Sequence, residues 1–532
     1  MPVASTQETT VDHTAPHRVA GSIGKNTIFG IIASAFQVGT RFVTVPVVIT
    51  HLGLDGYGIW AIIMTAAAYM RFGSVGIKSA FQKYVAESTG NGEYEKTNEL
   101  LSTGCAAMFV LSLLGLLPVC LFSRQLAKAA GVPSEFLTST ARSILVLALT
   151  MVIANTGAAY EAIVMGGHRI DLARKFNSAL TVAEAVAIIS VLHYGYGLFA
   201  MTLVMAASEL VFIGCCYAVS HRVAPQVHVA IRFVTKRAVP ELTRFAGSYQ
   251  LVSVLQILSG AIPQIAILRV FGAEASGVVA LASRLLSPMT MCQSAFLVPI
   301  LSGGAMIYAT GVRERMHNLL AKAYKVMLGA TFIPLGLVAT FGTYAIQAWT
   351  GQSDPRLGGV IWLGCLGALF QSFSLLFLVL YRVSGKALLD IVRESLRIAT
   401  TVLVIAFAHA LGFYGVIGGF ALAELAGLLC MIFAMFRTFE TFQAKTLLPD
   451  TVRLALAAVG IVVFAAFAVH FVPSYNANPR LLATLRVGAV GIAALISVYP
   501  FLHLTGALSS AEARSIVAVF KTRTAVTDPT AA

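Results

Sequence analysis

Three arginines lie in or at the end of long apolar runs of this sequence. Arg41 lies in "NTIFGIIASAFQVGTRFVTVPVVITHLG", Arg71 follows "AIIMTAAAYM", and Arg284 lies in "ASGVVALASRLLSPMTM". An arginine near the centre of a bilayer costs at least about 2.5–3.5 kcal/mol to insert, so it needs an anionic partner or a water-filled cavity. That partner is either a bound anion or a glutamate of a neighbouring helix. Arg71 lies near Lys78 at the cytoplasmic end of its predicted span, so its side chain could instead extend to the lipid headgroups.

Carboxylates and amides also interrupt the apolar runs. Buried glutamates in transporters bind a coupling proton or cation, balance an arginine, or form structural pairs. The four candidates for ion coupling are Glu161, Glu184, Glu209 and Glu424. Glu424 has no charged residue within 12 positions. Amides either contact a sugar or form hydrogen bonds between helices. The amide candidates are Gln37, Asn155, Gln256, Gln264 and Gln371.

These residues must be positioned by membrane-spanning helices. The chain has 532 residues, of which 58% are hydrophobic and 11% charged, whereas a soluble chain carries about 25% charge. Runs of about 18–25 apolar residues recur along it and predict an all-α polytopic membrane protein. We predict fourteen spans, at 27–50, 57–77, 100–122, 142–165, 177–195, 198–219, 244–270, 276–308, 324–346, 357–381, 392–411, 414–436, 452–472 and 483–504.

The basic residues predict the orientation of these spans. With the N-terminus inside, 27 of the 37 Lys and Arg fall in inner segments, among them Arg393 and Arg397. This bias predicts that both tails, 1–26 and 505–532, are cytoplasmic. The net charge of +14 therefore reflects inner loops that face anionic lipid. We do not expect a nucleic-acid partner.

Two parts of the sequence resemble each other and predict an internal repeat. "PVVITHLGLDGYGIW" begins at Pro46 and "PQIAILRVFGAEASGVV" at Pro263, and each contains two glycines five residues apart. We expect both prolines to act as hinges. The predicted parts are an N-terminal lobe at 27–220, a basic amphipathic surface helix in a cytoplasmic linker at 221–243, a C-terminal lobe at 244–436, and two further helices at 437–504. Pro263, Pro288 and Pro299 are expected to bend or break spans seven and eight.

The region around the first two spans resembles the polysaccharide-transport (Wzx-type) flippases of the multidrug/oligosaccharidyl-lipid/polysaccharide (MOP) exporter superfamily. The shared pattern is a proline near the end of the first helix, "LGLDGYGIW", "FGSVGI" and "NGEYEK". The resemblance implies two lobes in a V, and alternating access without ATP or another cofactor. It also implies undecaprenyl-diphosphate-linked oligosaccharide as the substrate. A monomer in the bacterial inner membrane, with a polymerase and chain-length proteins as partners, would fit this role.

The resemblance also suggests a role for the arginines. Related lipid II flippases carry essential arginines on the first, second and eighth helices, where this chain has Arg41, Arg71 and Arg284. The planar guanidinium can hold two phosphate oxygens at once. These three residues are therefore the candidates for diphosphate binding.

Other functions remain open at this point. The alternatives are a multidrug/cation antiporter of the same superfamily, a lipid II flippase, a membrane polymerase or glycosyltransferase, and a structural scaffold. Cavity arginines and fourteen spans favour the oligosaccharide flippase over the antiporter. Enzymes of this kind need a sizeable external loop, and the sequence has no such loop, metal-binding cluster, P-loop or nucleophile elbow.

Overall fold

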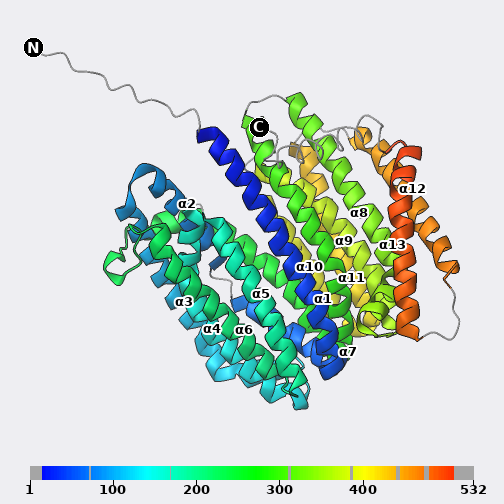
Figure 1. Ribbon diagram of the computed structural model, residues 1–532, viewed down its shortest axis with the longest axis horizontal. Coiled ribbons are helices and arrows are strands. Elements are labelled where there is room, and N and C mark those ends of the chain that lie inside the picture. Colours follow the sequence, from blue (N-terminus) through cyan, green and yellow to red (C-terminus); the bar gives the residue numbers. More distant parts are fainter. Residues whose placement is uncertain are drawn as a thin grey trace, which may run out of the picture. The chain divides into compact units, whose positions relative to one another are not determined.

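Helices are the only regular secondary structure in the part of the chain that the structure describes. The computed structural model describes residues 15–70, 74–167, 169–309, 313–383, 388–438, 444–472 and 478–507. The helices, labelled in Figure 1, are α1 (Ala15–Met70), α2 (Ser74–Asn91), α3 (Tyr94–Ala129), α4 (Ser134–Gly166), α5 (Ile170–His193), α6 (Leu198–Val223), the 3-10 helix η2 (Ile231–Phe233), α7 (Ala238–Ala309), α8 (Arg313–Thr350), α9 (Arg356–Val383), α10 (Leu388–Ala406), α11 (Ala408–Thr438), α12 (Ala444–His470) and α13 (Pro479–Leu504).

The predicted all-α membrane fold is confirmed. Eleven helical segments of the described chain are long and apolar enough to cross a membrane. Two of them, Phe42–Ala67 of α1 and Val254–Met289 of α7, each contain parts of two predicted spans. The span predicted at 392–411 lies mainly on α10, which carries four charged residues within Leu388–Ala406. The described residues of all fourteen predicted spans therefore lie mainly on helices, and the protein is a multi-pass membrane protein.

Glycines in the left-handed region recur at matching positions in the two halves of the chain. α1 reverses at Gly53 (φ 70°) and α7 at Gly272 (φ 88°), 219 residues later. The turns after α3 and α8 contain Gly131 and Gly351, the turn after α5 contains Gly195, and Gly412 marks a kink within α11. The members of these last two pairs are 220 and 217 residues apart, and all have positive φ. A residue with a β-carbon adopts this backbone at a cost. The pairs therefore support the internal repeat.

Of the bends or breaks predicted at the prolines of α7, the breaks do not occur. Within Ala238–Ala309 the only residue with non-helical dihedral angles is Gly272, so α7 remains helical through Pro263, Pro288 and Pro299. In α1 the corresponding break is at Gly53, seven residues after Pro46. Prolines are tolerated in membrane helices because neighbouring groups satisfy the freed carbonyls. The chain reverses at Gly53 and Gly272, where φ is positive.

The described chain forms two compact units. Unit 1 contains Met1–Val47, Met70–Ser123 and Arg142–Gln250, and unit 2 contains Val48–Tyr69, Arg124–Ala141 and Leu251–Ala532. These limits differ from the predicted lobes because two N-terminal segments belong to unit 2. In unit 2, a β-carbon added to Gly131 would lie 2.7 Å from the Arg269 Cα, so the turn after α3 packs directly on α7.

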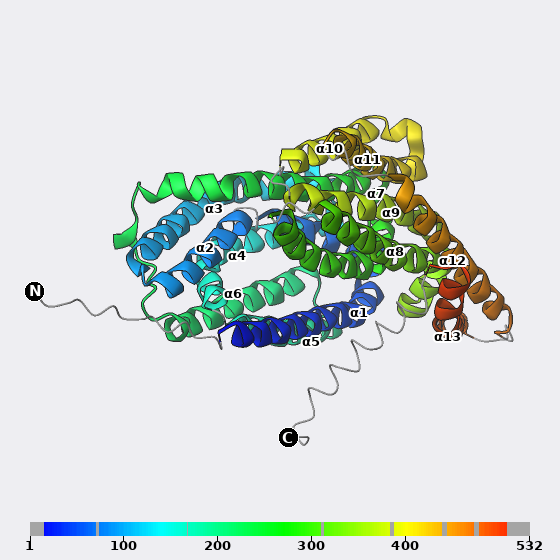
Figure 2. The ribbon, with the colours of Figure 1, turned by 90° about the horizontal axis from the view of Figure 1, so that it is seen from above.

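Each unit has its own helical packing. In unit 1, the α3–α4 contact includes a hydrogen bond from Asn155 Nδ2 to Ser112 Oγ (3.0 Å), and α5 packs on α6. In unit 2, α9 packs on α8 and α11, α10 on α11, and α12 on α8 and α13 (Figure 2). The start of α13 is set by sequence: Pro479 is its first residue, and the Asn478 side chain accepts a hydrogen bond from the Arg480 amide (3.0 Å).

The linker after α6 differs from the prediction. Instead of a surface helix over 221–243, α6 extends to Val223 and α7 begins at Ala238, with only η2 between them. Polar side chains of α3 bind the backbone of this segment. The Asn98 amide donates to Gln226 O (3.4 Å) and its Oδ1 accepts from the His228 amide (2.7 Å). These bonds replace those that a helix would have made.

Candidate functional site: a polar cavity beside a buried charge cluster

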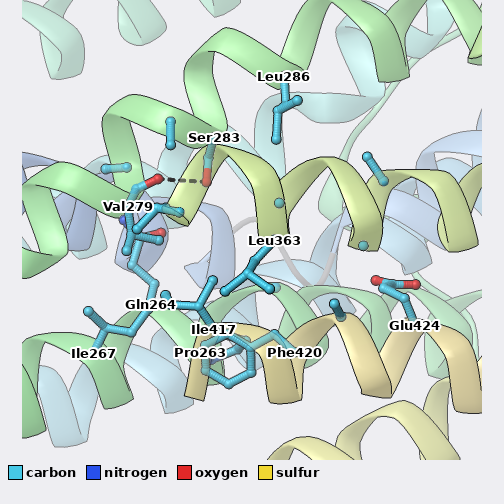
Figure 3. A pocket seen from close by; sticks show the side chains of 18 of the residues that line it. Pro263, Gln264, Ile267, Val279, Ser283, Leu286, Leu363, Ile417, Phe420 and Glu424 are labelled. Atoms are coloured by element: carbon cyan, nitrogen blue, oxygen red, sulfur yellow. Dashed lines mark hydrogen bonds between the residues drawn. The ribbon is translucent and has the colours of Figure 1, made fainter. Parts of the chain in front are cut away.

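Unit 2 contains a cavity of about 370 Å³ between α7, α9 and α11. Both halves of α7 contribute to it, because the reversal at Gly272 brings Ser283 opposite Gln264 and Pro263. The apolar wall includes Ile267, Leu286, Leu363, Ile417 and Phe420. In Figure 3, Glu424 lies on the opposite side of the cavity from Gln264 and Ser283. The volume falls in the range of about 300–1,000 Å³ that is usual for small-molecule sites.

Small residues of α9 make room for the cavity. Gly364 and Gly367 both line it, and neither could gain a β-carbon without new contacts. An added Cβ on Gly364 would lie 2.9 Å from Leu286 Cδ1, and one on Gly367 would lie 3.6 Å from the Ala421 Cα. Close approach of this kind is typical of helix packing in membranes.

The polar groups of the cavity differ in how well they are hydrogen-bonded. The Ser283 hydroxyl donates to Val279 O (2.8 Å), and the Ser287 hydroxyl donates to Arg284 O (2.9 Å). The Thr65 hydroxyl donates to Gln264 Oε1 (3.2 Å). No hydrogen bond to the Gln264 Nε2 or to the Gln371 amide occurs among the described residues.

Glu424 connects the cavity to a cluster of buried charges. Its Oε1 accepts a hydrogen bond from Arg397 Nη2, and its Oε2 lies 4.0 Å from Arg393 Nη2 without a hydrogen bond from any described residue. Glu394 accepts from Arg393 Nη1 (2.6 Å) through Oε1 and from Arg397 Nη1 (2.6 Å) through Oε2. Arg393 Nε donates to the Ser374 hydroxyl (2.5 Å).

This cluster is unusually deep. The side chains of Arg393 and Glu394 are 2% and 1% exposed. Gly427, one turn after Glu424 on α11, makes space for it, since an added Cβ would lie 3.1 Å from Arg397 Cγ. The two arginines face the two glutamates, and Asp390 of the same helix is a third buried carboxylate nearby; paired opposite charges make such burial tolerable.

Comparison with known proteins identifies the fold. No family model matches the chain. It is 20% identical over 385 residues to the "uncharacterized membrane protein EpsK" of Bacillus subtilis (strain 168), covering 70% of this chain and 74% of that protein. The lipid II flippase MurJ in its inward closed conformation matches with a TM-score of 0.71 at 14% identity, covering 90% of this chain and 99% of MurJ.

Multidrug transporters also match. A MATE family transporter of the MOP superfamily in an inward-facing conformation has a TM-score of 0.61 at 14% identity, covering 76% of this chain and 94% of that one. The Vibrio cholerae MATE transporter VcmN has a TM-score of 0.56 at 16% identity, covering 81% and 100%. The chain has the MurJ/MATE fold.

Within this MurJ-like fold, the candidate residues fall into separate groups. Gln264, Glu424 and Pro263 line the cavity of unit 2, together with Gln371. Arg284 lies on α7, half-buried, but does not line the cavity, and its side chain has no ion pair within the described part. The side chains of Gln37 and Arg41, and the whole of Arg71, lie outside the described residues.

The other candidates belong to unit 1 or to the surface of α7. Glu161 of α4 forms an ion pair with Lys78 of α2, and Asn155 bonds to Ser112. Glu184 and Glu209 are half-buried on α5 and α6. On α7, Gln256 is exposed and does not line the cavity.

The sequence reasoning missed the charge cluster. Arg393 and Arg397 were assigned to inner segments, but on α10 Arg393 is buried and Arg397 is half-buried within the cluster. A signal was present: Asp390, Arg393, Glu394 and Arg397 recur at intervals of three or four residues and share one helix face. Glu424, the isolated carboxylate of α11, is the partner of these arginines.

Proposed function

We propose that the protein is a flippase that moves undecaprenyl-diphosphate-linked oligosaccharide, such as an O-antigen or exopolysaccharide repeat unit, across the bacterial inner membrane by alternating access. The supporting observation is the fold likeness to MurJ, which extends over 90% of this chain. The likeness to the two MATE transporters extends over 76% and 81% of this chain. In this proposal both termini are cytoplasmic and the protein acts as a monomer. A polymerase and chain-length proteins would use the product.

The arginines would bind the diphosphate. Arg284 supports this role because it is a half-buried cation on a spanning helix without an ionic partner among the described residues. Such a charge is expensive unless water or a ligand surrounds it. Arg41 and Arg71 are proposed for the same role, and Gln37, Asn155, Gln256 and Gln264 for sugar contacts. The hydrogen bond of Asn155 to Ser112 favours a packing role for that residue.

Glu424 is the favoured residue for coupling to a proton or cation. It lines the cavity, and its Oε2 has no hydrogen bond from the described residues. Glu161 is already paired with Lys78, which makes it a weaker candidate. Glu184 and Glu209 stay in the proposal without further support. Pro46 and Pro263 are proposed to permit the helix bending that alternating access requires.

Reconstituted transport tests the proposal. Proteoliposomes loaded with fluorescent polyprenyl-diphosphate oligosaccharide should show protein-dependent exposure of the sugar to an external oxidising enzyme. We expect Arg284→Ala to reduce the rate at least about tenfold, because a charge-assisted contact contributes about 1.5–3 kcal/mol, while Arg269→Ala, an exposed arginine of the same helix, leaves it unchanged. Equal rates with wild-type protein and empty vesicles would contradict the proposed function.

A multidrug/cation antiporter is the second candidate, and the likeness to MATE transporters favours it. The same vesicles can be assayed with a fluorescent cationic dye under a proton or sodium gradient. Dye efflux without movement of the lipid-linked sugar would support the antiporter. Transport of lipid II in preference to other lipid-linked sugars would instead support a lipid II flippase.

A further inference from the structure

The cavity of unit 2 holds more hydrogen-bonding capacity than the protein itself uses. The Gln371 amide and the Gln264 Nε2 have no hydrogen-bond partner among the described residues, and neither does Glu424 Oε2. All three side chains belong to helices that span the membrane. Both glutamines are only half-buried, so their amides are open to the cavity. The arrangement therefore calls for water or a ligand.

Asn155 shows what a packing amide looks like in the same chain. It is 3% exposed, and its Nδ2 donates to Ser112 Oγ of the adjacent helix. Gln371 is also in the middle of a spanning helix, but it faces a cavity and leaves its amide unused. Helix packing explains Asn155, whereas it gives no account of Gln371.

The mixture of groups defines the chemistry of the ligand. Two amide NH2 groups donate, while Gln371 Oε1 and the hydroxyls of Ser283 and Ser287 accept. A sugar hydroxyl or acetamido group both donates and accepts, so it can satisfy both kinds. Phe420 and the aliphatic wall offer apolar surface to the carbon face of a sugar ring.

Two other ligands fit less well. A diphosphate would face the carboxylate of Glu424, and like charges repel strongly in a low-dielectric site. A bare cation would need oxygen atoms converging within about 2.0–2.6 Å of one point. Glu424 and Gln264 lie on opposite sides of a cavity of about 370 Å³ instead.

We propose that this cavity binds an uncharged sugar ring of the lipid-linked saccharide, with the amides of Gln264 and Gln371 as donors and Gln371 Oε1 and the Ser283 hydroxyl as acceptors. The proposal rests on the proposed function and assigns to the substrate's sugar a site separate from the one for its diphosphate. Arg284 is consistent with this division, since it does not line the cavity.

Binding to the full-length protein in nanodiscs tests the site. The probes are farnesyl diphosphate carrying glucose or N-acetylglucosamine, and farnesyl diphosphate without sugar. We expect Gln371→Leu and Gln264→Leu each to weaken binding of a glycosylated probe about two- to tenfold, as one lost hydrogen bond predicts. Binding of the bare diphosphate should not change. Gln125→Leu, an exposed glutamine of α3 to which no binding role is assigned, is the matched control.

A second variant covers the case in which a leucine disturbs folding. Ser283 lines the cavity and is exposed to it, so Ser283→Phe fills the space and should abolish the preference for the glycosylated probe. If the variants bind that probe as tightly as wild-type protein, the sugar site is wrong, while the proposed function stands. If wild-type protein neither binds nor moves any lipid-linked saccharide, both fall.

Discussion

Gly58 and Gly277 lie against each other's helix backbone in unit 2. A β-carbon on Gly58 would lie 2.2 Å from Ala273 O, and one on Gly277 would lie 2.2 Å from Leu54 O. The two contacts are reciprocal: Gly58 and Gly277 are 219 residues apart, as are Leu54 and Ala273. The internal repeat inferred from sequence is therefore also a physical contact between its two copies.

Enlarging either glycine should open this contact. We expect Gly58→Ala or Gly277→Ala to lower stability by about 1–3 kcal/mol, because overpacking at a backbone contact forces the helices apart. Thermal unfolding of the purified protein in detergent measures the effect. Gly39→Ala, on the same helix as Gly58 but with nothing within 4 Å of the added carbon, should unfold at or above the wild-type temperature. Equal melting temperatures for all three variants would refute the close contact.

Removing one arginine of the charge cluster should be costly. Arg397→Met leaves Glu394 and Glu424 with one arginine between them, so we expect a loss of about 3–5 kcal/mol. Restoring neutrality with Arg397→Met plus Glu424→Gln should recover part of it. Arg174→Met, which removes an exposed arginine of α5, is the control. A double variant no more stable than Arg397→Met would show that charge balance is not what the cluster provides.

The loop between α8 and α9 should respond to acid. The Arg356 guanidinium bonds both carboxylate oxygens of Asp354 (Nε to Oδ1 3.0 Å, Nη2 to Oδ2 2.6 Å), and this lowers the pKa of Asp354. A lowered pKa in the folded state gives stability that is present above the unfolded value of about 3.9 and is lost as pH falls through the folded value. Melting of Asp354→Asn should therefore lie below wild type by a constant amount at pH 5–7.

The acid limit completes this test. Below about pH 4 the difference between Asp354→Asn and wild type should shrink. Asp171→Asn, a carboxylate whose lysine partner is 3.8 Å away, should show a smaller difference throughout. A gap for Asp354→Asn that widens toward low pH would contradict the sign of the pKa shift.

Removing the Asn98 side chain of α3 should loosen the segment between α6 and α7. Asn98 makes both side-chain hydrogen bonds to the segment at Gln226 and His228. We expect Asn98→Ala to speed tryptic cleavage at the exposed Arg232 severalfold, because cleavage requires the segment to detach. Glu95→Ala, an exposed change on the same helix, should leave the rate unchanged. Cleavage of Asn98→Ala at the wild-type rate would mean that other contacts hold the linker.

The sequence predicted the helices well, because long apolar runs in a membrane have one stable backbone. Gly53 and Gly272 were located by their repeated spacing, and both mark reversals of the chain. The prediction failed where a residue's surroundings decide its state. Arg393 and Arg397 counted as orienting charges because counting cannot detect that Glu424 lies across from them. Nor could spacing show that Gln264 of α7 and Gln371 of α9 face one cavity.

The residues of the charge cluster on α10 have counterparts in the first copy of the repeat. At a spacing of 219 residues, Asp390 and Arg393 correspond to Asp171 and Arg174, while Glu394 corresponds to Lys175. In the first copy this helix start is a surface feature, with Lys175 and Arg174 exposed; in the second, Arg393 and Glu394 are buried. The exposed Lys175 of the first copy is replaced in the second by Glu394, which bonds to both Arg393 and Arg397. The two copies thus share the helix and differ in the charges that it carries.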